Sequence, residues 1–181
     1  MALKDGDYKR IGRELVKKLH IFDLYEDTLV IPDGREVKYD FLMHKGAAAV
    51  VPVLDDGRIL MVKQFRNALD RYTLEIPAGG RDSENEDFCI AAKRELEEET
   101  GYKSDDLEHL ITIATAVAYC SEKIEVYVAK NLVKTNQNLD DDEFIDVYPY
   151  TTDELTEMIK SGQIEDSKTI ASIMSYINLC D

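Results

Sequence analysis

Apolar residues either run together or alternate with polar ones over most of the chain, and they change to a helical spacing in three places. Continuous or alternating apolar positions predict β-strands, whereas apolar positions at i, i+3 and i+4 predict helices. The predicted strands lie at residues 18–31, 37–43, 46–54, 58–65, 72–76, 107–117, 123–129 and 144–147, and the predicted helices at 84–99, 151–162 and 170–177. Strands before and after one long helix, with two helices at the end, indicate an α/β fold in which a mixed sheet is covered on both faces.

The beginning of the chain is predicted to form an extension ahead of the main domain. Residues 1–16 allow two interpretations, a short helix or a frayed terminus. The strands on either side of the turn at residues 32–34 make a β-hairpin, which is marginally stable alone and has to pack on something. We therefore expect a β-hairpin extension at residues 1–43 and a main domain at residues 44–181, within one globular unit.

The helix predicted at residues 84–99 has recognisable start and stop signals. Ser83 is the predicted N-cap, and Glu86 three residues later completes a capping box. Gly101 occupies the position where a residue in the left-handed conformation ends a helix. These signals bound the segment that holds the densest run of carboxylates in the chain.

Three of those carboxylates share the apolar side of the helix. At 100° per residue, Glu95, Glu98 and Glu99 continue the stripe of Phe88, Ala91 and Ala92, while Glu97 points the other way. Burying three like charges costs several kcal/mol unless a cation compensates them. Clustered carboxylate oxygens suit Mg²⁺ or Mn²⁺. A solvated acidic face, the alternative, would not share a stripe with apolar residues, so we keep that interpretation for Glu97 alone.

The same segment resembles the signature of a known family. Gly80, then Glu86 six positions later, then the sequence Arg94-Glu95-Leu96-Glu97-Glu98-Glu99-Thr100-Gly101 resembles the Nudix box, GX5EX7REUXEEXGU, with Tyr102 in place of the last aliphatic residue. The resemblance implies a Nudix-type α/β/α sandwich with a mixed sheet. It also implies hydrolysis of the diphosphate that links a nucleoside to another group.

The resemblance assigns roles within this segment. Glu95, Glu98 and Glu99 are the implied catalytic residues and metal ligands, and a main-chain carbonyl at Gly79 is implied to join them. The implied cofactor is Mg²⁺ or Mn²⁺. Arg94 is expected to hold a neighbouring glutamate rather than to contact the substrate.

Two further segments indicate a branch of the family. Residues 62–66, Val-Lys-Gln-Phe-Arg, and 74–80, Leu-Glu-Ile-Pro-Ala-Gly-Gly, are similar to ADP-ribose pyrophosphatases. ADP-ribose would yield AMP and ribose 5-phosphate. The segment 116–122 lacks the Ser-Pro-Gly turn of many such enzymes, which leaves another nucleotide sugar, such as GDP-mannose, as an alternative substrate.

Residues outside the box complete the predicted site. Arg66, Glu75 and Arg81 are the predicted substrate-binding residues; Arg66 suits a phosphate as a planar fork, although a surface arginine on a strand would look the same. The general base is sought in the acidic loop at residues 140–143, where Asp141 and Glu143 are the candidates. A solvated acidic loop would explain these two residues equally well.

Composition narrows the classes of function. The chain of 181 residues is 44% apolar and 33% charged, as in soluble globular proteins, and its formal net charge of −15 argues against a nucleic-acid partner. No apolar run approaches membrane-spanning length and residues 1–12 are polar, so we expect no membrane partner, anchor or signal peptide. Because neither a signal peptide nor an anchor is visible, we expect a cytoplasmic protein. Three cysteines without CxxC spacing predict reduced thiols and no zinc site. They are Cys89, Cys120 and Cys180.

The family resemblance also bears on assembly and on the non-enzymatic alternatives. In ADP-ribose pyrophosphatases the N-terminal strands help to form a homodimer whose active sites use both subunits, so a homodimer is implied here. A Nudix-like sensor that binds a nucleotide without cleaving it is one alternative, but such a module need not keep a metal-binding carboxylate cluster. An acidic protein-interaction surface is another, and it predicts no metal requirement.

Overall fold

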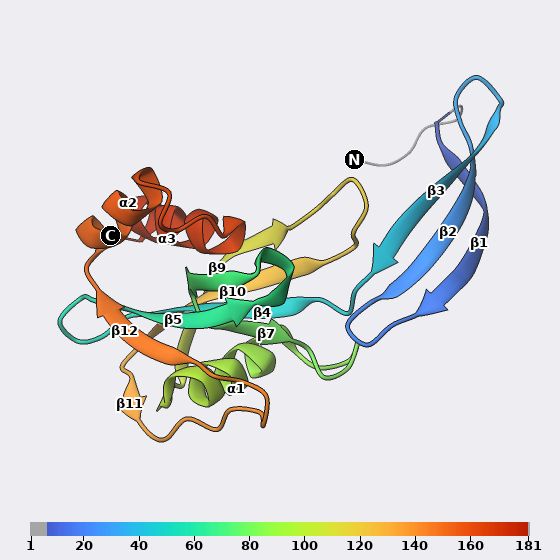
Figure 1. The fold of residues 1–181 in the computed structure, drawn as a ribbon. Coiled ribbons are helices and arrows are strands. Elements are labelled where there is room, and N and C mark those ends of the chain that lie inside the picture. Colours follow the sequence, from blue (N-terminus) through green and yellow to red (C-terminus); the bar gives the residue numbers. More distant parts are fainter. Residues whose placement is uncertain (1–6, 181) are drawn as a thin grey trace. The chain divides into compact units, whose positions relative to one another are not determined.

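The apolar run at residues 46–54 forms the central strand of the main sheet. In the computed structural model, which describes residues 7–180, this strand is β4 (Ala47–Pro52; Figure 1). All six of its residues are buried. It pairs in parallel with β10 (Lys123–Lys130) and antiparallel with β7 (Ala78–Gly80). β9 (Asp106–Ala114) completes the order β7-β4-β10-β9, so the sheet is mixed, as predicted.

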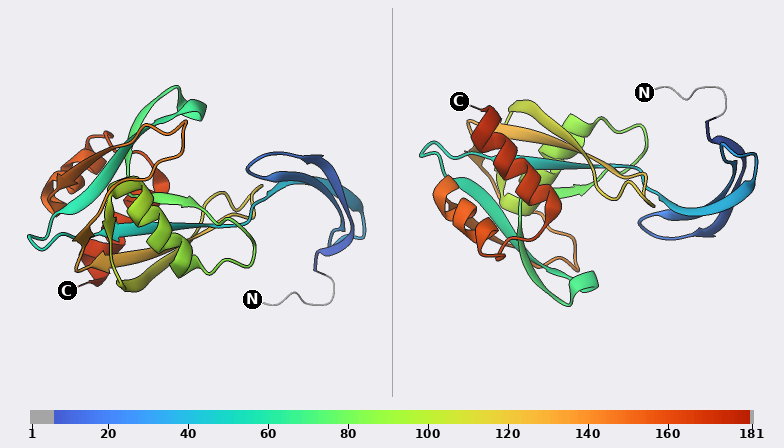
Figure 2. Two further views of the ribbon diagram at one scale, coloured as in Figure 1. Left: turned by 90° about the horizontal axis from the view of Figure 1, so that it is seen from below. Right: turned by 90° about the horizontal axis from the view of Figure 1, so that it is seen from above.

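Helices cover both faces of this sheet. Because side chains alternate along a strand, β4 contributes to two cores. On one face, Ala48 and Val50 pack against α1 (Phe88–Thr100). On the other, Ala49 and Val51 belong to the core that includes buried residues of the C-terminal region, and Figure 2 shows α1 and α3 on opposite sides of the sheet. The C-terminal helices are α2 (Thr152–Lys160) and α3 (Ser167–Leu179). This is the predicted α/β/α sandwich.

Two smaller sheets complete the same unit. One is antiparallel with the order β12-β5-β6, and the other pairs β8 with β11. Their strands are β12 (Asp146–Tyr150), β5 (Ile59–Arg66), β6 (Arg71–Glu75), β8 (Tyr102–Lys103) and β11 (Val133–Lys134), and the 3₁₀ helix η1 (Asn67–Leu69) follows β5. The strand predicted at residues 144–147 corresponds to β12 and begins two residues later than expected, because Phe144 is exposed. β11 was missed, since two residues carry no periodicity.

Residues 7–45 and 116–122 form a separate compact unit. Its sheet is antiparallel with the order β1-β2-β3, formed by β1 (Lys9–Lys18), β2 (Asp23–Val30) and β3 (Glu36–Met43). The predicted hairpin is β2–β3, and the helix considered for residues 1–16 is wrong over the described part. Cross-strand contacts decide this: Arg13 forms two 2.7 Å hydrogen bonds to Asp27.

The start of α1 differs from the prediction. The N-cap is Asp87 rather than Ser83, because the Asp87 carboxylate accepts hydrogen bonds from two N–H groups of the first turn. Glu86 does not complete a capping box; its carboxylate accepts the N–H of Asp82 at 2.6 Å. The predicted stop is confirmed, since Gly101 adopts the left-handed conformation with φ 69°. Within residues 7–180, no helix is both long and apolar enough to cross a membrane.

Candidate active site

The three predicted carboxylates of α1 lie on the face that packs against β7. Glu95 and Glu99 are buried, and Glu98 is partly buried. The backbone N–H of Ala78 donates to Glu99 Oε2 at 2.9 Å. Gly79 lies so close to Glu95 that a Cβ atom on Gly79 would overlap the Glu95 carboxylate. The absence of a side chain at this glycine therefore makes room for a buried carboxylate beside the main chain.

Arg94 ties the carboxylates together. Its Nη1 donates to Glu95 Oε1 at 2.6 Å and to Glu98 Oε2 at 3.1 Å, and its Nη2 donates to the carbonyl of Gly80 at 2.8 Å. The predicted contact between Arg94 and a neighbouring glutamate is thus present. Among residues 7–180, no three acidic, histidine or cysteine side chains form a ready-made metal site. In this arrangement, Arg94 donates hydrogen bonds to the carboxylate oxygens of Glu95 and Glu98.

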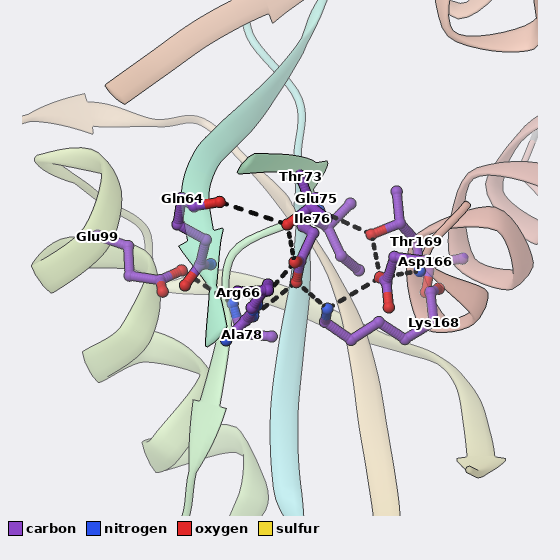
Figure 3. Close-up of polar contacts among 11 residues, drawn as sticks. Gln64, Arg66, Thr73, Glu75, Ile76, Ala78, Glu99, Asp166, Lys168 and Thr169 are labelled. Atoms are coloured by element: carbon purple, nitrogen blue, oxygen red, sulfur yellow. Dashed lines mark hydrogen bonds and ion pairs between the residues drawn. The ribbon is translucent and has the colours of Figure 1, made fainter. Parts of the chain in front are cut away.

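A second polar cluster surrounds Glu75 at the end of β6 (Figure 3). Glu75 is 2% exposed. Arg66 grips it as a fork, with Nε at 2.7 Å from Oε1 and Nη2 at 2.6 Å from Oε2. Thr73 donates to Oε1 at 2.6 Å, and Lys168 donates to Oε2. Glu75, a predicted substrate-binding residue, is therefore an internal partner of Arg66 in this structure.

The first turn of α3 supplies the part of this cluster that the sequence did not predict. Asp166 is the N-cap of α3, and its carboxylate accepts the N–H of Thr169 at 2.9 Å and the ammonium of Lys168 at 2.9 Å. Thr169 Oγ1 in turn accepts the N–H of Ile76 at 3.0 Å. Apolar spacing identified the helix, but it carries no signal for a buried lysine that pairs with a strand 93 residues away in sequence.

Arg81 is engaged by the loop that precedes α1. Its Nη1 donates to the carbonyls of Glu84 and Glu86, both at 2.9 Å. Its guanidinium carbon lies 4.1 Å from the centre of the Phe88 ring, a cation–π distance. These contacts order the loop, and substrate contact by Arg81 stays a prediction.

Comparison with known proteins identifies the family. A model of the NUDIX domain matches residues 43–173. The chain belongs to the Nudix family. The Nudix box of the sequence analysis is therefore the loop before α1 together with α1 itself, and the protein is a Nudix hydrolase.

The similarity to known proteins extends over nearly the whole chain. The methanol dehydrogenase activator of Bacillus methanolicus is 39% identical over 173 residues, which cover 94% of this chain and 92% of that protein. The ADP-ribose pyrophosphatase of Bacillus subtilis strain 168 is 35% identical over 179 residues, covering 98% and 96%. A crystal structure of an ADP compounds hydrolase shares the fold, with a TM-score of 0.84, 20% identity, and coverage of 98% of this chain and 95% of that one.

Burial disfavours the charged form of two carboxylates on α1. Burial raises the pKa of Glu95 from 4.5 to about 7, against the opposing effect of Arg94, and Glu98 and Glu143 raise it further. Burial also raises the pKa of Glu99 from 4.5 to about 8, with Glu95 and Glu143 adding to the rise. Hard oxygen donors whose charge the protein does not balance fit a divalent cation.

Of the two loop candidates, Glu143 is the one that acts on this cluster. Its charge adds a small rise to the pKa of both Glu95 and Glu99, well behind the effect of burial. Asp141 is not among those causes, although both loop residues are exposed. The Glu143 carboxylate itself accepts the N–H of Asp140 within the loop, at 3.3 Å, so Glu143 as the general base stays a prediction.

Burial would raise the pKa of Glu75 too, but here the opposite shift results. Hydrogen bonds from Arg66 and the charge of Lys168 outweigh burial and hold the pKa of Glu75 at about 2. Glu75 is thus fully ionised at neutral pH, whereas Glu95 and Glu99, with pKa values of about 7 and about 8, are only partly ionised in the absence of a cation. The difference follows from the number of cations in contact, two for Glu75 against one shared arginine on α1.

Proposed function

We propose that this Nudix hydrolase cleaves the diphosphate of ADP-ribose to AMP and ribose 5-phosphate, with a divalent cation. The observation that carries the proposal is the cluster of three carboxylates on α1, two of them buried, which shares a single contacting arginine, so that burial outweighs the compensating charge. The 35% identity to an ADP-ribose pyrophosphatase over almost the full chain supports the substrate. Mg²⁺ is the proposed ion, held by Glu95, Glu98, Glu99 and the carbonyl of Gly79, with Mn²⁺ as the alternative.

The side chains divide the work of hydrolysis. When bound, the cation would neutralise phosphate oxygens and lower the pKa of a water molecule. Arg94 orients Glu95 and Glu98 through its hydrogen bonds. Arg66 binds a substrate phosphate, and Glu143 takes the proton of the attacking water, whose oxygen bonds to phosphorus as the phosphorus–oxygen bond to the departing phosphate breaks.

A substrate panel tests this function directly. We expect ADP-ribose to be hydrolysed in the presence of Mg²⁺, and Glu98→Gln to abolish the turnover because a carboxylate of the cluster is lost. The measurement is phosphate released by a coupled phosphatase from ADP-ribose, GDP-mannose, NADH, diadenosine polyphosphates and nucleoside triphosphates. Turnover of another compound alone would replace the substrate and keep the mechanism. Nucleotide binding without turnover would indicate a sensor instead.

A second candidate function comes from the relative that is 39% identical, a methanol dehydrogenase activator. The present chain would then act on or beside a dehydrogenase. Dehydrogenases use nicotinamide dinucleotides, which contain the same kind of diphosphate, and NADH is in the panel for this reason. Turnover of NADH in preference to ADP-ribose would favour this candidate.

We further propose that the protein is a homodimer. The observation is the unit that contains β1, where Ile11, Leu15 and Val16 are about half-exposed on a strand at the edge of its sheet. Exposed apolar side chains on an edge strand are typical of a surface that pairs with another chain. We expect light scattering to give twice the chain mass of 20.6 kDa. A mass of one chain at micromolar concentration would contradict the dimer.

A cytoplasmic location is also proposed. Cys89, Cys120 and Cys180 are all free thiols in this structure. Free, dispersed cysteines are the usual pattern in a reducing compartment.

A further inference from the structure

Lys168 is a buried lysine whose charge is committed to Glu75. It is 8% exposed, and its ammonium contacts Glu75 Oε2 and Asp166 Oδ2. Asp166 is the N-cap of α3, where the N–H groups and the dipole of the helix already offset its charge. Glu75 has no such helix terminus among its partners. The charge of Lys168 is therefore balanced mainly by Glu75.

Arg66 contacts Glu75 through only one edge of its guanidinium. Its Nε and Nη2 bind the carboxylate, and Nη1 has no partner within residues 7–180. The Arg66 side chain is 39% exposed, whereas that of Glu75 is 3% exposed. Glu75 thus orients the guanidinium from inside the protein and leaves its outer edge for an anion from solvent.

We propose that Lys168 is a positioning residue that neutralises Glu75, so that the positive charge of Arg66 remains for a substrate phosphate. This inference rests on the proposed function, since it requires a diphosphate substrate. Without Lys168, the negative charge of Glu75 would cancel the positive charge of Arg66. Arg66 would then no longer offset the negative charge of Glu99. The site would then present excess negative charge to an anionic substrate.

The first turn of α3 is held by hydrogen bonds that do not involve the ammonium group of Lys168. The charge of Lys168 can therefore be removed without loss of this turn. Thr169 is fully buried; it accepts the N–H of Ile76 at 3.0 Å and donates to Asp166 at 2.6 Å. These bonds join the first turn of α3 to the residue that follows Glu75. Lys168→Met keeps them and keeps an unbranched side chain only one atom shorter, so it removes little more than the ammonium group.

The test compares affinity and turnover in four variants of the full chain. For Lys168→Met we expect KM for ADP-ribose and the calorimetric Kd for ADP to rise about tenfold, with kcat within about threefold of wild type. Lys168→Arg keeps the charge and should stay within about threefold on every constant. The matched control is Lys160→Met, because this α2 lysine is 65% exposed and pairs only with Glu157 among the described residues.

The double variant Lys168→Met/Glu75→Gln separates charge from structure. It lacks both charges of the pair but leaves the charge of Arg66, so ADP should bind at least about threefold more tightly than to Lys168→Met, though more weakly than to wild type because a glutamine orients Arg66 through one oxygen only. A purely structural role predicts a lower melting temperature for Lys168→Met with unchanged Kd and KM. That result would overturn the inference, and so would a double variant as weak as Lys168→Met.

Failure of the proposed function is recognised separately. If the wild type does not hydrolyse ADP-ribose, the substrate proposal is wrong, while the calorimetric Kd for ADP still decides the role of Lys168. ADP that binds the wild type with a Lys168-dependent Kd would support the inference even then. ADP that does not bind the wild type would overturn it.

Discussion

Glu99→Gln is expected to lower kcat for ADP-ribose by about 10²- to 10³-fold and, at the same time, to stabilise the metal-free protein. The loss of turnover follows from removing one oxygen ligand of the proposed cation. The fold should persist, because the amide oxygen can still accept the N–H of Ala78 that now reaches Glu99 at 2.9 Å. Turnover and stability therefore move in opposite directions.

The gain in stability depends on pH with a definite sign. The pKa of Glu99 rises from 4.5 to about 8 on folding, so the folded state favours the protonated form. The contribution of Glu99 to the stability of the folded state is fully present below pH 4.5 and is lost as the pH rises through about 8. A glutamine does not ionise and avoids that loss, so Glu99→Gln should gain about 1–3 kcal/mol at pH 8, or about 3–8 °C in Tm, and almost nothing at pH 4.5.

Thermal unfolding with and without Mg²⁺ measures this effect. Millimolar Mg²⁺ should raise the Tm of the wild type at pH 8 and have less effect on Glu99→Gln, because a bound cation offsets the same charge. The matched control is Glu97→Gln on the same helix, since Glu97 lines a surface pocket with Lys93 and Asn131 rather than the carboxylate cluster. It should keep kcat within about twofold. If Glu99→Gln kept the kcat of the wild type, Glu99 would not be part of the active site.

Gly79→Ala is expected to lower kcat about 10²-fold while leaving the protein folded. A Cβ atom at this position would overlap the carboxylate of Glu95. The carboxylate is the end of a flexible side chain, so it moves aside rather than breaking the sheet. Displacing a buried catalytic group by an ångström or more is enough for a loss of this size.

Gly80→Ala is the matched control for this prediction. It adds the same methyl group one residue further along β7, where no atom lies within 4 Å of the new Cβ. We expect kcat within about threefold of wild type, and a similar Tm for both alanine variants. The measurement is steady-state ADP-ribose hydrolysis together with thermal unfolding. Equal activity of the two variants would show that the Glu95 carboxylate does not need its place beside Gly79.

The sequence by itself determined the features that depend on local periodicity. The helical spacing of Glu95, Glu98 and Glu99 with two alanines placed the carboxylates on the packed face of α1, and the structure buries Glu95 and Glu99 there. The alternation and the runs of apolar residues located most strands of the mixed sheet. These signals are readable because an element that covers a core repeats its apolar side with its own period.

Tertiary contacts, rather than the local sequence, determined where α1 starts and that β1 is a strand. Both Ser83 and Asp87 are acceptable N-caps in sequence, and the loop contacts of Arg81 and Glu86 leave Asp87 as the residue that caps. β1 has weak periodicity and becomes a strand by pairing along β2. Local propensity was nearly neutral in both cases, so tertiary bonds determined the outcome.

Only the tertiary structure brings distant charges together. Lys168 meets Glu75 across 93 positions, and Glu143 acts on carboxylates more than forty residues earlier in the chain. Such pairs leave no periodic trace, because their partners lie on different elements. The pKa values of about 2 for Glu75 and about 8 for Glu99 follow from these neighbours. A carboxylate's charge state depends on burial and on the cations beside it, and both are set by the fold.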